Sequence, residues 1–285
     1  MKRYALPLLT LLGGIGCFFL RLQQNRSGFE PDTGLPIPGH PLALLLPIVF
    51  LLLTAAAALL ILRVSGKGED LRDFRRCVAS DCAAAFALTV AGVFLWLAAG
   101  AAAIIPGITG GEAFTPTPVP GLYLPADPSA LRAEMVLGVL TVVSAAALLP
   151  AAAACRKGGK RREDRAPVNG NLLLLPPAAM VIRLALSYRE MSVNASQQSY
   201  YVRLLALVLL IPALFRLSSF AFRCGQARRF LLYAAPAVLF CITALADVAS
   251  LSHRLFFGGG AVLLLGFMLA LLSADAPEPP AEQDA

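Results

Sequence analysis

Four ionisable side chains lie inside long apolar stretches of the sequence, and these are the residues best placed to do chemistry. They are Arg183, Arg203, Arg216 and Asp247. A charged side chain within a bilayer is costly unless it is paired, so such residues commonly mark a site or an ion pair. Counted along their helices, Arg183, Arg203 and Asp247 fall at a similar depth near one membrane face. Arg216 falls near the other face, where we expect it to extend toward lipid headgroups.

The polar layer around these three residues has two interpretations. The first is an outward-facing pocket for a small anion or an anionic lipid headgroup, in which Asp247 orients one of the arginines. The second is an interhelical ion pair within a belt of interfacial tyrosine and arginine side chains. The candidate site comprises Arg183, Arg203, Asp247, Tyr188, Tyr200 and Tyr201.

Sequence signatures of catalysis, metal binding and cofactor binding are sparse. The chain has two histidines, His40 and His253, and its six cysteines form no C-x-x-C pair, so we expect no metal ligands. No phosphate-binding glycine loop is present, so we expect no nucleotide cofactor. Asp247, Ser250 and His253 lie close together, but their spacing does not place all three on one helical face. We therefore expect no catalytic residues, and no cofactor of any kind.

The elements that position these residues follow from composition. Of 285 residues, 58% are hydrophobic and only 14% are charged, with a mean hydropathy of +0.73. A soluble domain carries about 25% charged residues. The apolar residues come in blocks of about 20, which is the length of a helix that crosses a bilayer. The sequence therefore predicts an all-α, polytopic transmembrane bundle. Its net charge of +7 reflects membrane topology, so nucleic acid is not expected as a partner.

Eight apolar runs predict eight spanning helices. The spans are predicted near residues 4–20, 41–62, 82–105, 135–154, 172–187, 200–222, 230–251 and 255–272. We expect residues 1–273 to form one membrane domain and residues 274–285 to form a disordered acidic tail. The first run is interpreted as an uncleaved helix rather than a signal peptide. The fifth is short and begins with Pro176 and Pro177, so whether it spans fully stays open.

Two connections between the runs are distinctive. The proline-rich segment 106–133 is expected to form an irregular ordered cap. Runs seven and eight are separated only by residues 252–254, which predicts a tight helical hairpin.

Lysine and arginine alternate between the two ends of the predicted helices. If the N-terminus is cytoplasmic, the inner segments hold sixteen basic residues and the outer segments hold five. Cytoplasmic loops carry such an excess, so both termini are predicted to lie in the cytoplasm. The outer five are Arg21, Arg26, Arg132, Arg189 and Arg254.

Several stretches carry a resemblance to known sequences. They are residues 24–30 and 33–39 after the first run, and later 188–189, 204–207, 220–222, 228–229 and 245–247. In these stretches the chain resembles a group of uncharacterised multipass membrane proteins of anaerobic Gram-positive bacteria, and the resemblance extends over about half of the chain. The resemblance implies the bacterial plasma membrane as the compartment, and it implies no activity or site residue.

Three hypotheses for the function follow. The first is a non-enzymatic, permease-like or accessory protein that recognises an anion or headgroup through a solvent-reachable cavity lined by Arg183, Arg203 and Asp247. The second is a scaffold for another membrane protein, in which these three residues pair with one another. The third is an intramembrane lipid-modifying enzyme that uses Asp247 or His253. The expected partners are the lipid bilayer, anionic headgroups or a small anion, and a membrane protein.

Overall fold

The computed structural model describes residues 4–30, 36–63, 74–109, 114–116, 123–125, 128–156, 168–191, 201–248 and 250–274. In these ranges the chain is almost entirely helical, and eight helices are long and apolar enough to cross a membrane. They cover Ala5–Ser27, Pro41–Leu62, Ala83–Thr109, Leu131–Ala154, Gly170–Arg189, Tyr201–Ser219, Ala227–Asp247 and Leu251–Ser273. The predicted all-α fold with eight spanning helices is confirmed.

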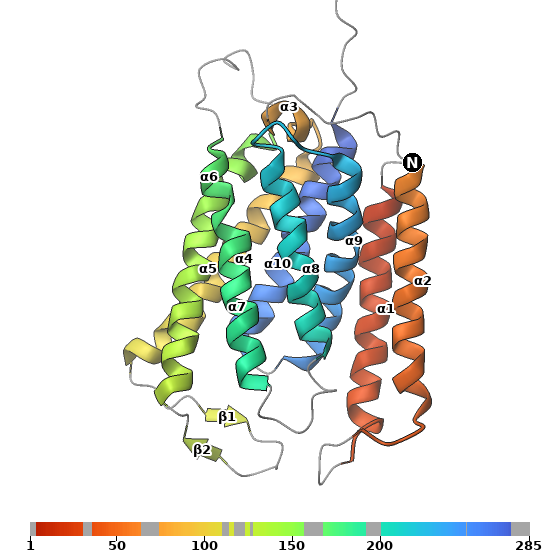
Figure 1. The fold of residues 1–285 in the computed structure, drawn as a ribbon, viewed down its shortest axis with the longest axis vertical. Coiled ribbons are helices and arrows are strands. Elements are labelled where there is room, and N and C mark those ends of the chain that lie inside the picture. Colours follow the sequence, from red (N-terminus) through yellow and green to blue (C-terminus); the bar gives the residue numbers. More distant parts are fainter. Residues whose placement is uncertain are drawn as a thin grey trace, which may run out of the picture.

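Successive spanning helices run in opposite directions along the bundle (Figure 1). In chain order they are α1 (Ala5–Ser27), α2 (Pro41–Leu62), α3 (Phe74–Val78), α4 (Ala83–Thr109), β1 (Phe114–Pro116), β2 (Tyr123–Pro125), α5 (Pro128–Ala154), α6 (Gly170–Leu173), α7 (Leu175–Met191), α8 (Tyr201–Ser219), α9 (Ala227–Ala244), the short 3-10 helix η2 (Leu245–Asp247) and α10 (Leu251–Ser273).

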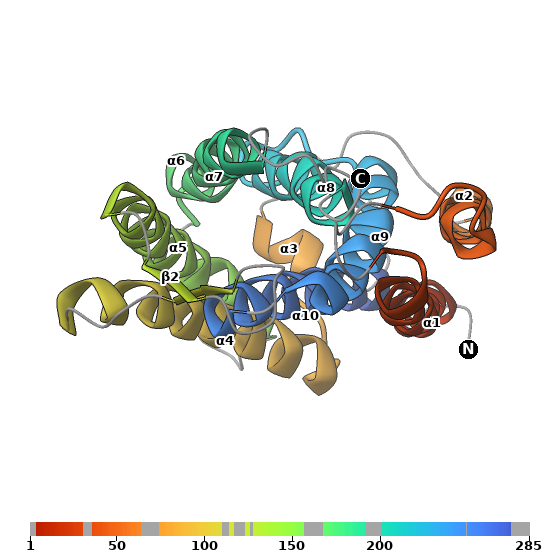
Figure 2. The ribbon, with the colours of Figure 1, turned by 90° about the horizontal axis from the view of Figure 1, so that it is seen from below.

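Six of the helices close a ring. Helix α4 packs on α5, α5 on α7, α7 on α8, α8 on α9, α9 on α10, and α10 returns to α4 (Figure 2). The short helix α3 lies across one end of this ring and packs against α5 and α10. We call this the α3 end. The opposite end, where β1 and β2 lie, is called the ribbon end (Figure 1).

The closest helix packing in the ring is between α4 and α10, and glycines permit it. We call this contact the α4–α10 seam. A Cβ atom on Gly92 would lie 2.6 Å from the backbone nitrogen of Leu263, and one on Gly266 would lie 2.6 Å from that of Thr89. Small residues let two helix backbones approach in this way. The seam fixes the position of the first turns of α10, which carry part of the site.

Helices α1 and α2 lie outside the ring, against α9 (Figure 2). Phe50 of α2 stacks on Phe240 of α9 with ring centroids 4.1 Å apart. Gly14 of α1 lets that helix approach Ile242 of α9, because a Cβ there would lie 2.8 Å from the Ile242 side chain.

Three predicted boundaries were wrong near the ribbon end. Helix α1 continues to Ser27 rather than ending near residue 20, so Arg21 is a helical residue and not part of a connection. Helix α9 ends at Ala244, earlier than the predicted residue 251. Helix α10 begins at Leu251, so His253 lies in its first turn instead of in a hairpin loop. In each case polar side chains find partners inside the bundle, and the helices do not end where apolar residues end.

The fifth predicted run forms α6 and α7, separated at Leu174. Pro176 is the second residue of α7, a position where a proline loses no helical hydrogen bond. In the predicted cap 106–133, α4 continues to Thr109, the strands β1 and β2 pair antiparallel, and α5 begins at Pro128. Other parts of this cap, and the predicted tail from residue 275 onward, lie outside the described residues.

Candidate functional site

A buried ion pair joins α1 to the end of α9. Nε of Arg21 donates to Oδ1 of Asp247 over 2.7 Å, and the two side chains are 0% and 4% exposed. Nδ2 of Asn25 donates to the same oxygen over 2.8 Å and also to the carbonyl of Ala246 over 3.2 Å. Arg21 and Asn25 are one helical turn apart on α1, so both reach η2 from the same helix face.

The guanidinium of Arg21 has further partners. Its Nη1 donates to Oε1 of Gln24 over 2.9 Å. Its Cζ atom lies 5.1 Å from the ring centroid of Tyr201 and 5.8 Å from that of Phe29. Arg21, Gln24, Asn25, Tyr201 and Asp247 are called the Arg21 cluster below.

The predicted pairing of Asp247 with Arg183 or Arg203 was wrong in its partner, because the arginine in contact with Asp247 is Arg21. Sequence reasoning placed Arg21 in an outer connection, since the apolar run ends at Leu20. The available signal was the spacing of Arg21, Gln24 and Asn25, which puts three polar side chains on one face if the helix continues.

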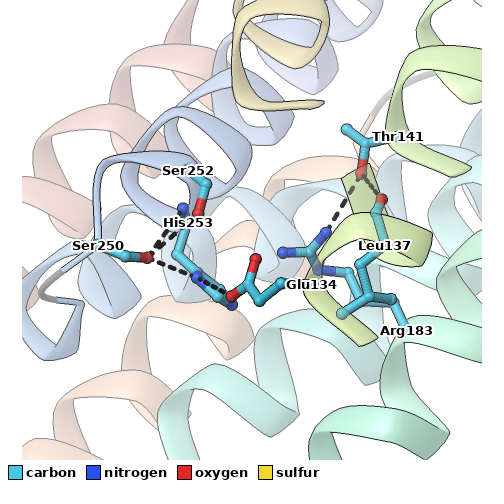
Figure 3. A network of polar contacts seen from close by, with 7 residues as sticks. All are labelled: Glu134, Leu137, Thr141, Arg183, Ser250, Ser252 and His253. Atoms are coloured by element: carbon cyan, nitrogen blue, oxygen red, sulfur yellow. Dashed lines mark hydrogen bonds and ion pairs between the residues drawn. The ribbon is translucent and has the colours of Figure 1, made fainter. Parts of the chain in front are cut away.

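Arg183 is the second buried arginine of the ribbon end. Its side chain reaches from α7 into the ring, where Nη1 donates to Oγ1 of Thr141 on α5 over 3.2 Å (Figure 3). Its Cζ atom lies 3.9 Å from the ring centroid of Phe256 on α10. Arg183 is 5% exposed. The guanidinium of this α7 residue thus touches two other helices of the ring, α5 and α10, and its partners are a neutral hydroxyl and an aromatic ring.

Phe256 is held in place by the single tryptophan of the chain. Nε1 of Trp96 on α4 donates to the carbonyl of Phe256 over 2.9 Å, and the two rings are stacked with centroids 5.4 Å apart. Trp96 and Phe256 are fully buried. The aromatic wall beneath Arg183 is therefore rigidly attached to the α4–α10 seam.

A carboxylate and a histidine lie beside Arg183. Nδ1 of His253 on α10 lies 3.5 Å from Oε1 of Glu134 on α5 and 2.6 Å from Oγ of Ser250 (Figure 3). Ser250 also caps α10 by accepting from the backbone nitrogen of His253 over 3.4 Å. A Ser-His-acid relay needs the hydroxyl on one ring nitrogen and the acid on the other. Here both approach Nδ1, so the three residues do not form such a relay.

Glu134, Thr141, Arg183, His253 and Phe256 are called the Arg183 cluster below. Arg203, near the start of α8, lies close enough to Arg183, His253 and Asp247 for their charges to interact. Its charge therefore acts on both the Arg183 cluster and the Arg21 cluster.

The tyrosines of the candidate site differ in their positions. Tyr201 lies against Arg21. Tyr188 is 62% exposed on α7. Tyr200 lies outside the described residues. Of the six predicted residues, the structure thus gathers Arg183, Arg203, Asp247 and Tyr201 at the ribbon end, whereas reasoning from the sequence missed Arg21, Asn25, Glu134 and Thr141.

Within the described ranges, no group of three or more histidine, cysteine, aspartate or glutamate side chains is arranged to hold a metal ion. The ribbon end of the ring is instead a place where buried arginines meet aromatic rings and hydroxyls. The chain matches no protein-family model, no curated protein and no solved structure.

Proposed function

We propose that this integral membrane protein is a permease-like or accessory protein that binds an oxyanion at Arg183, inside the helical ring at its ribbon end. The ligand class is a small carboxylate, sulfate or phosphate, or the phosphate of an anionic lipid headgroup. The protein would act in the bacterial plasma membrane with both termini cytoplasmic, so that the ribbon end faces outward.

The observation that carries this proposal is the set of partners of Arg183. A guanidinium has five N–H donors. In the described residues only one of them makes a hydrogen bond, to Thr141, and no carboxylate lies within ion-pair distance of Arg183. A buried arginine is normally paired, because its charge is costly to remove from water. An oxyanion would take up the remaining donors with the geometry that guanidinium favours.

The charges around Arg183 support an anion over a cation. Arg203 adds a second positive charge near Arg183, and Glu134 adds one negative charge. The Phe256 ring covers one side of the guanidinium, with Cζ 3.9 Å from the ring centroid. The net positive charge attracts an anion, and Glu134 limits the charge that the site carries when it is empty.

The proposed orientation is supported by the basic residues at the α3 end. Helices and turns there carry Arg63, Arg156, Arg223, Arg228 and Arg229. At the ribbon end Arg21 and Arg183 are buried and Arg203 is half-buried, so these three do not count as loop charges, whereas Arg26, Arg132, Arg189 and Arg254 are exposed there. Cysteines placed singly at the two ends, labelled from outside intact cells, test this orientation.

Thermal unfolding of the purified protein in an uncharged detergent tests the binding function. Sulfate, phosphate and acetate should each be added, and so should phosphatidylglycerol, with phosphatidylcholine as the uncharged lipid control. A ligand that binds the folded state raises Tm as its concentration increases. Arg183→Gln should abolish this shift. Arg216→Gln, which removes a half-buried arginine near the α3 end of α8, should retain it.

The outcomes distinguish the sources of the anion and the competing hypotheses. Stabilisation by free oxyanions identifies a small-anion site, and stabilisation by phosphatidylglycerol alone identifies a headgroup site. If a well-folded protein responds to neither, or if Arg183→Gln responds as the unchanged chain does, the proposal fails. The scaffold hypothesis would then lead, with the Arg21–Asp247 ion pair in place of the pairing of Asp247 with Arg183 or Arg203 that it predicted.

A further inference from the structure

We propose that Asp247 is a proton-binding site and that a proton binds there together with the anion at Arg183. This inference rests on the proposed function, and it names the ion that accompanies the anion. It goes beyond the anion site because Asp247 belongs to the Arg21 cluster and not to the Arg183 cluster.

The two oxygens of Asp247 have different surroundings. Oδ1 accepts from both Arg21 and Asn25. Oδ2 is buried and has no hydrogen-bond partner among the residues that the structure describes. A buried carboxylate oxygen without a donor is costly, so this atom has a strong tendency to acquire a proton or a cation.

A proton fits this oxygen better than a metal ion. Sodium or calcium requires several oxygen ligands arranged around it. The described neighbours of Asp247 do not supply them, because Asn25 and Arg21 present N–H groups to it. A proton needs only the one oxygen. It also leaves Oδ1 in place as an acceptor, so the hydrogen bonds from Arg21 and Asn25 survive protonation.

Arg21 keeps other stabilising contacts when Asp247 is neutral. Gln24 still accepts from its Nη1, and the rings of Tyr201 and Phe29 still face its guanidinium. Cation–π contacts and a neutral amide acceptor hold an arginine without a counter-charge. The Arg21 cluster is therefore built to tolerate both protonation states of Asp247.

Arg203 links the two sites, because its charge acts on Asp247, on Arg183 and on His253. The groups that act on Asp247 are Arg21 and Asn25 from α1 and Tyr201 and Arg203 from α8. From the start of α10, Arg254 donates to the carbonyl of the neighbouring Val248, and His253 is coupled to Arg203. An anion at Arg183 offsets part of the positive charge that opposes protonation of Asp247. Linkage is reciprocal, so a proton on Asp247 must strengthen anion binding to the same degree.

Proton uptake on addition of sulfate is the decisive measurement, because sulfate itself does not titrate near neutral pH. The purified protein is held in weakly buffered detergent with a pH indicator, and sulfate binding is followed in parallel. We expect uptake of up to one proton per sulfate bound. In its pH-dependent range the affinity for sulfate should rise by at most about tenfold for each unit that pH falls, which is the limit for one linked proton.

Two substitutions assign the proton. Asp247→Asn should bind sulfate without proton uptake and with an affinity independent of pH. His253→Asn removes a titratable group of the Arg183 cluster, and it should still take up a proton for each sulfate that binds, whatever its affinity for sulfate. If Asp247→Asn does not fold, the double variant Asp247→Asn with Arg21→Gln removes both charges together and is measured instead. Uptake that survives loss of Asp247, or disappears with loss of His253, overturns the proposal.

A further measurement distinguishes rejection of anion binding at Arg183 from rejection of proton binding at Asp247. If the unchanged protein binds no sulfate, infrared spectroscopy of the carboxyl region is recorded as the sample is acidified mildly. A protonated carboxyl band that is present in the unchanged protein and absent from Asp247→Asn supports the proton site on its own. Absence of any difference between the two proteins overturns it.

Discussion

Arg21 and Asp247 lie 226 positions apart in the sequence and meet as a buried ion pair with a 2.7 Å contact between Nε and Oδ1. The pair attaches the α1–α2 hairpin, which lies outside the ring, to the point where α9 turns toward α10 (Figure 2). Any change in this contact therefore acts on the peripheral hairpin and on the first turn of α10 together.

Removal of one partner of this pair should destabilise the protein strongly. Arg21→Gln leaves the carboxylate of Asp247 buried without its cation, and the expected loss is about 3–5 kcal/mol. The double variant Arg21→Gln with Asp247→Asn should lose less than the sum of the two single changes, because neither charge is then left alone. Unfolding in a mixed-detergent titration measures all four proteins of this cycle. Strict additivity would show that the pair contributes nothing specific.

The α4–α10 seam should not accept a side chain at Gly92. An alanine Cβ there would lie 2.6 Å from the Leu263 nitrogen and 2.7 Å from its Cα, both backbone atoms that cannot rotate away. We expect Gly92→Ala to lower the free energy of unfolding by about 1–3 kcal/mol, the usual cost of overpacking.

Gly258→Ala is the matched control for that change, because a Cβ at Gly258 would meet no atom within 4 Å. It lies in α10, so it tests helix composition without closing the seam. Thermal unfolding of both variants in the same detergent gives the comparison. Equal effects of the two substitutions would contradict the close approach of α4 and α10.

The fluorescence of Trp96 should report on the anion site. The residue is the only tryptophan of the chain, and its ring is stacked on that of Phe256. The Phe256 ring also makes a cation–π contact with Arg183. Binding of an oxyanion at Arg183 changes the charge beside that ring, so we expect a saturable change in emission as the anion is added. Arg183→Gln should remove the change, and Arg216→Gln should keep it. A fluorescence response unaffected by Arg183→Gln would place the anion elsewhere.

Cys155, just beyond the end of α5, should be inert to thiol reagents in the folded protein. Burial raises the pKa of the Cys155 thiol from 9.0 to about 12, against a smaller lowering effect of a hydrogen bond with Thr89. The thiolate that reacts is thus absent at neutral pH. Maleimide should label the exposed Cys224 quickly, and Cys155 only after unfolding.

The same shift in the pKa of Cys155 gives a pH dependence of stability. The folded state favours the neutral thiol, so this contribution is complete below pH 9.0 and is lost as pH rises toward about 12. Cys155→Ala should flatten this part of the stability curve. Rapid labelling of Cys155 in the folded protein would refute its burial against α4.

Much of the fold could be predicted because lipid imposes simple rules. Apolar runs of about 20 residues must become helices, so the number of spans followed directly from composition. The second helix, Pro41–Leu62, even begins and ends where its apolar run does. The ring could not be predicted, because apolar runs do not specify which neighbours they pack against. The glycines at Gly92 and Gly266 that decide this for α4 and α10 look like ordinary small residues in the sequence.

The candidate site was partly accessible from sequence for a related reason. Depth along a helix can be counted, so the shared level of Arg183, Arg203 and Asp247 could be inferred. Partner choice depends on how each helix is rotated and on where it truly ends, and neither follows from counting. Arg21 was missed because α1 continues beyond the apolar residues to Ser27, and its buried face extends through Arg21 to Gln24.

The closed ring has a consequence for how the protein is made. Helix α10 completes the ring between α4 and α9, and it is the most buried of the eight spanning helices, yet it is the last of them to leave the ribosome. Until α10 is inserted, the glycine-lined face of α4 and the face of α9 that packs on α10 lack the described helix that covers both of them. Before α10 is inserted, the helices in the bilayer therefore form an open arc and not a closed ring. Late biogenesis is then the stage at which insertion factors or quality-control proteases have the most exposed helix surface to recognise.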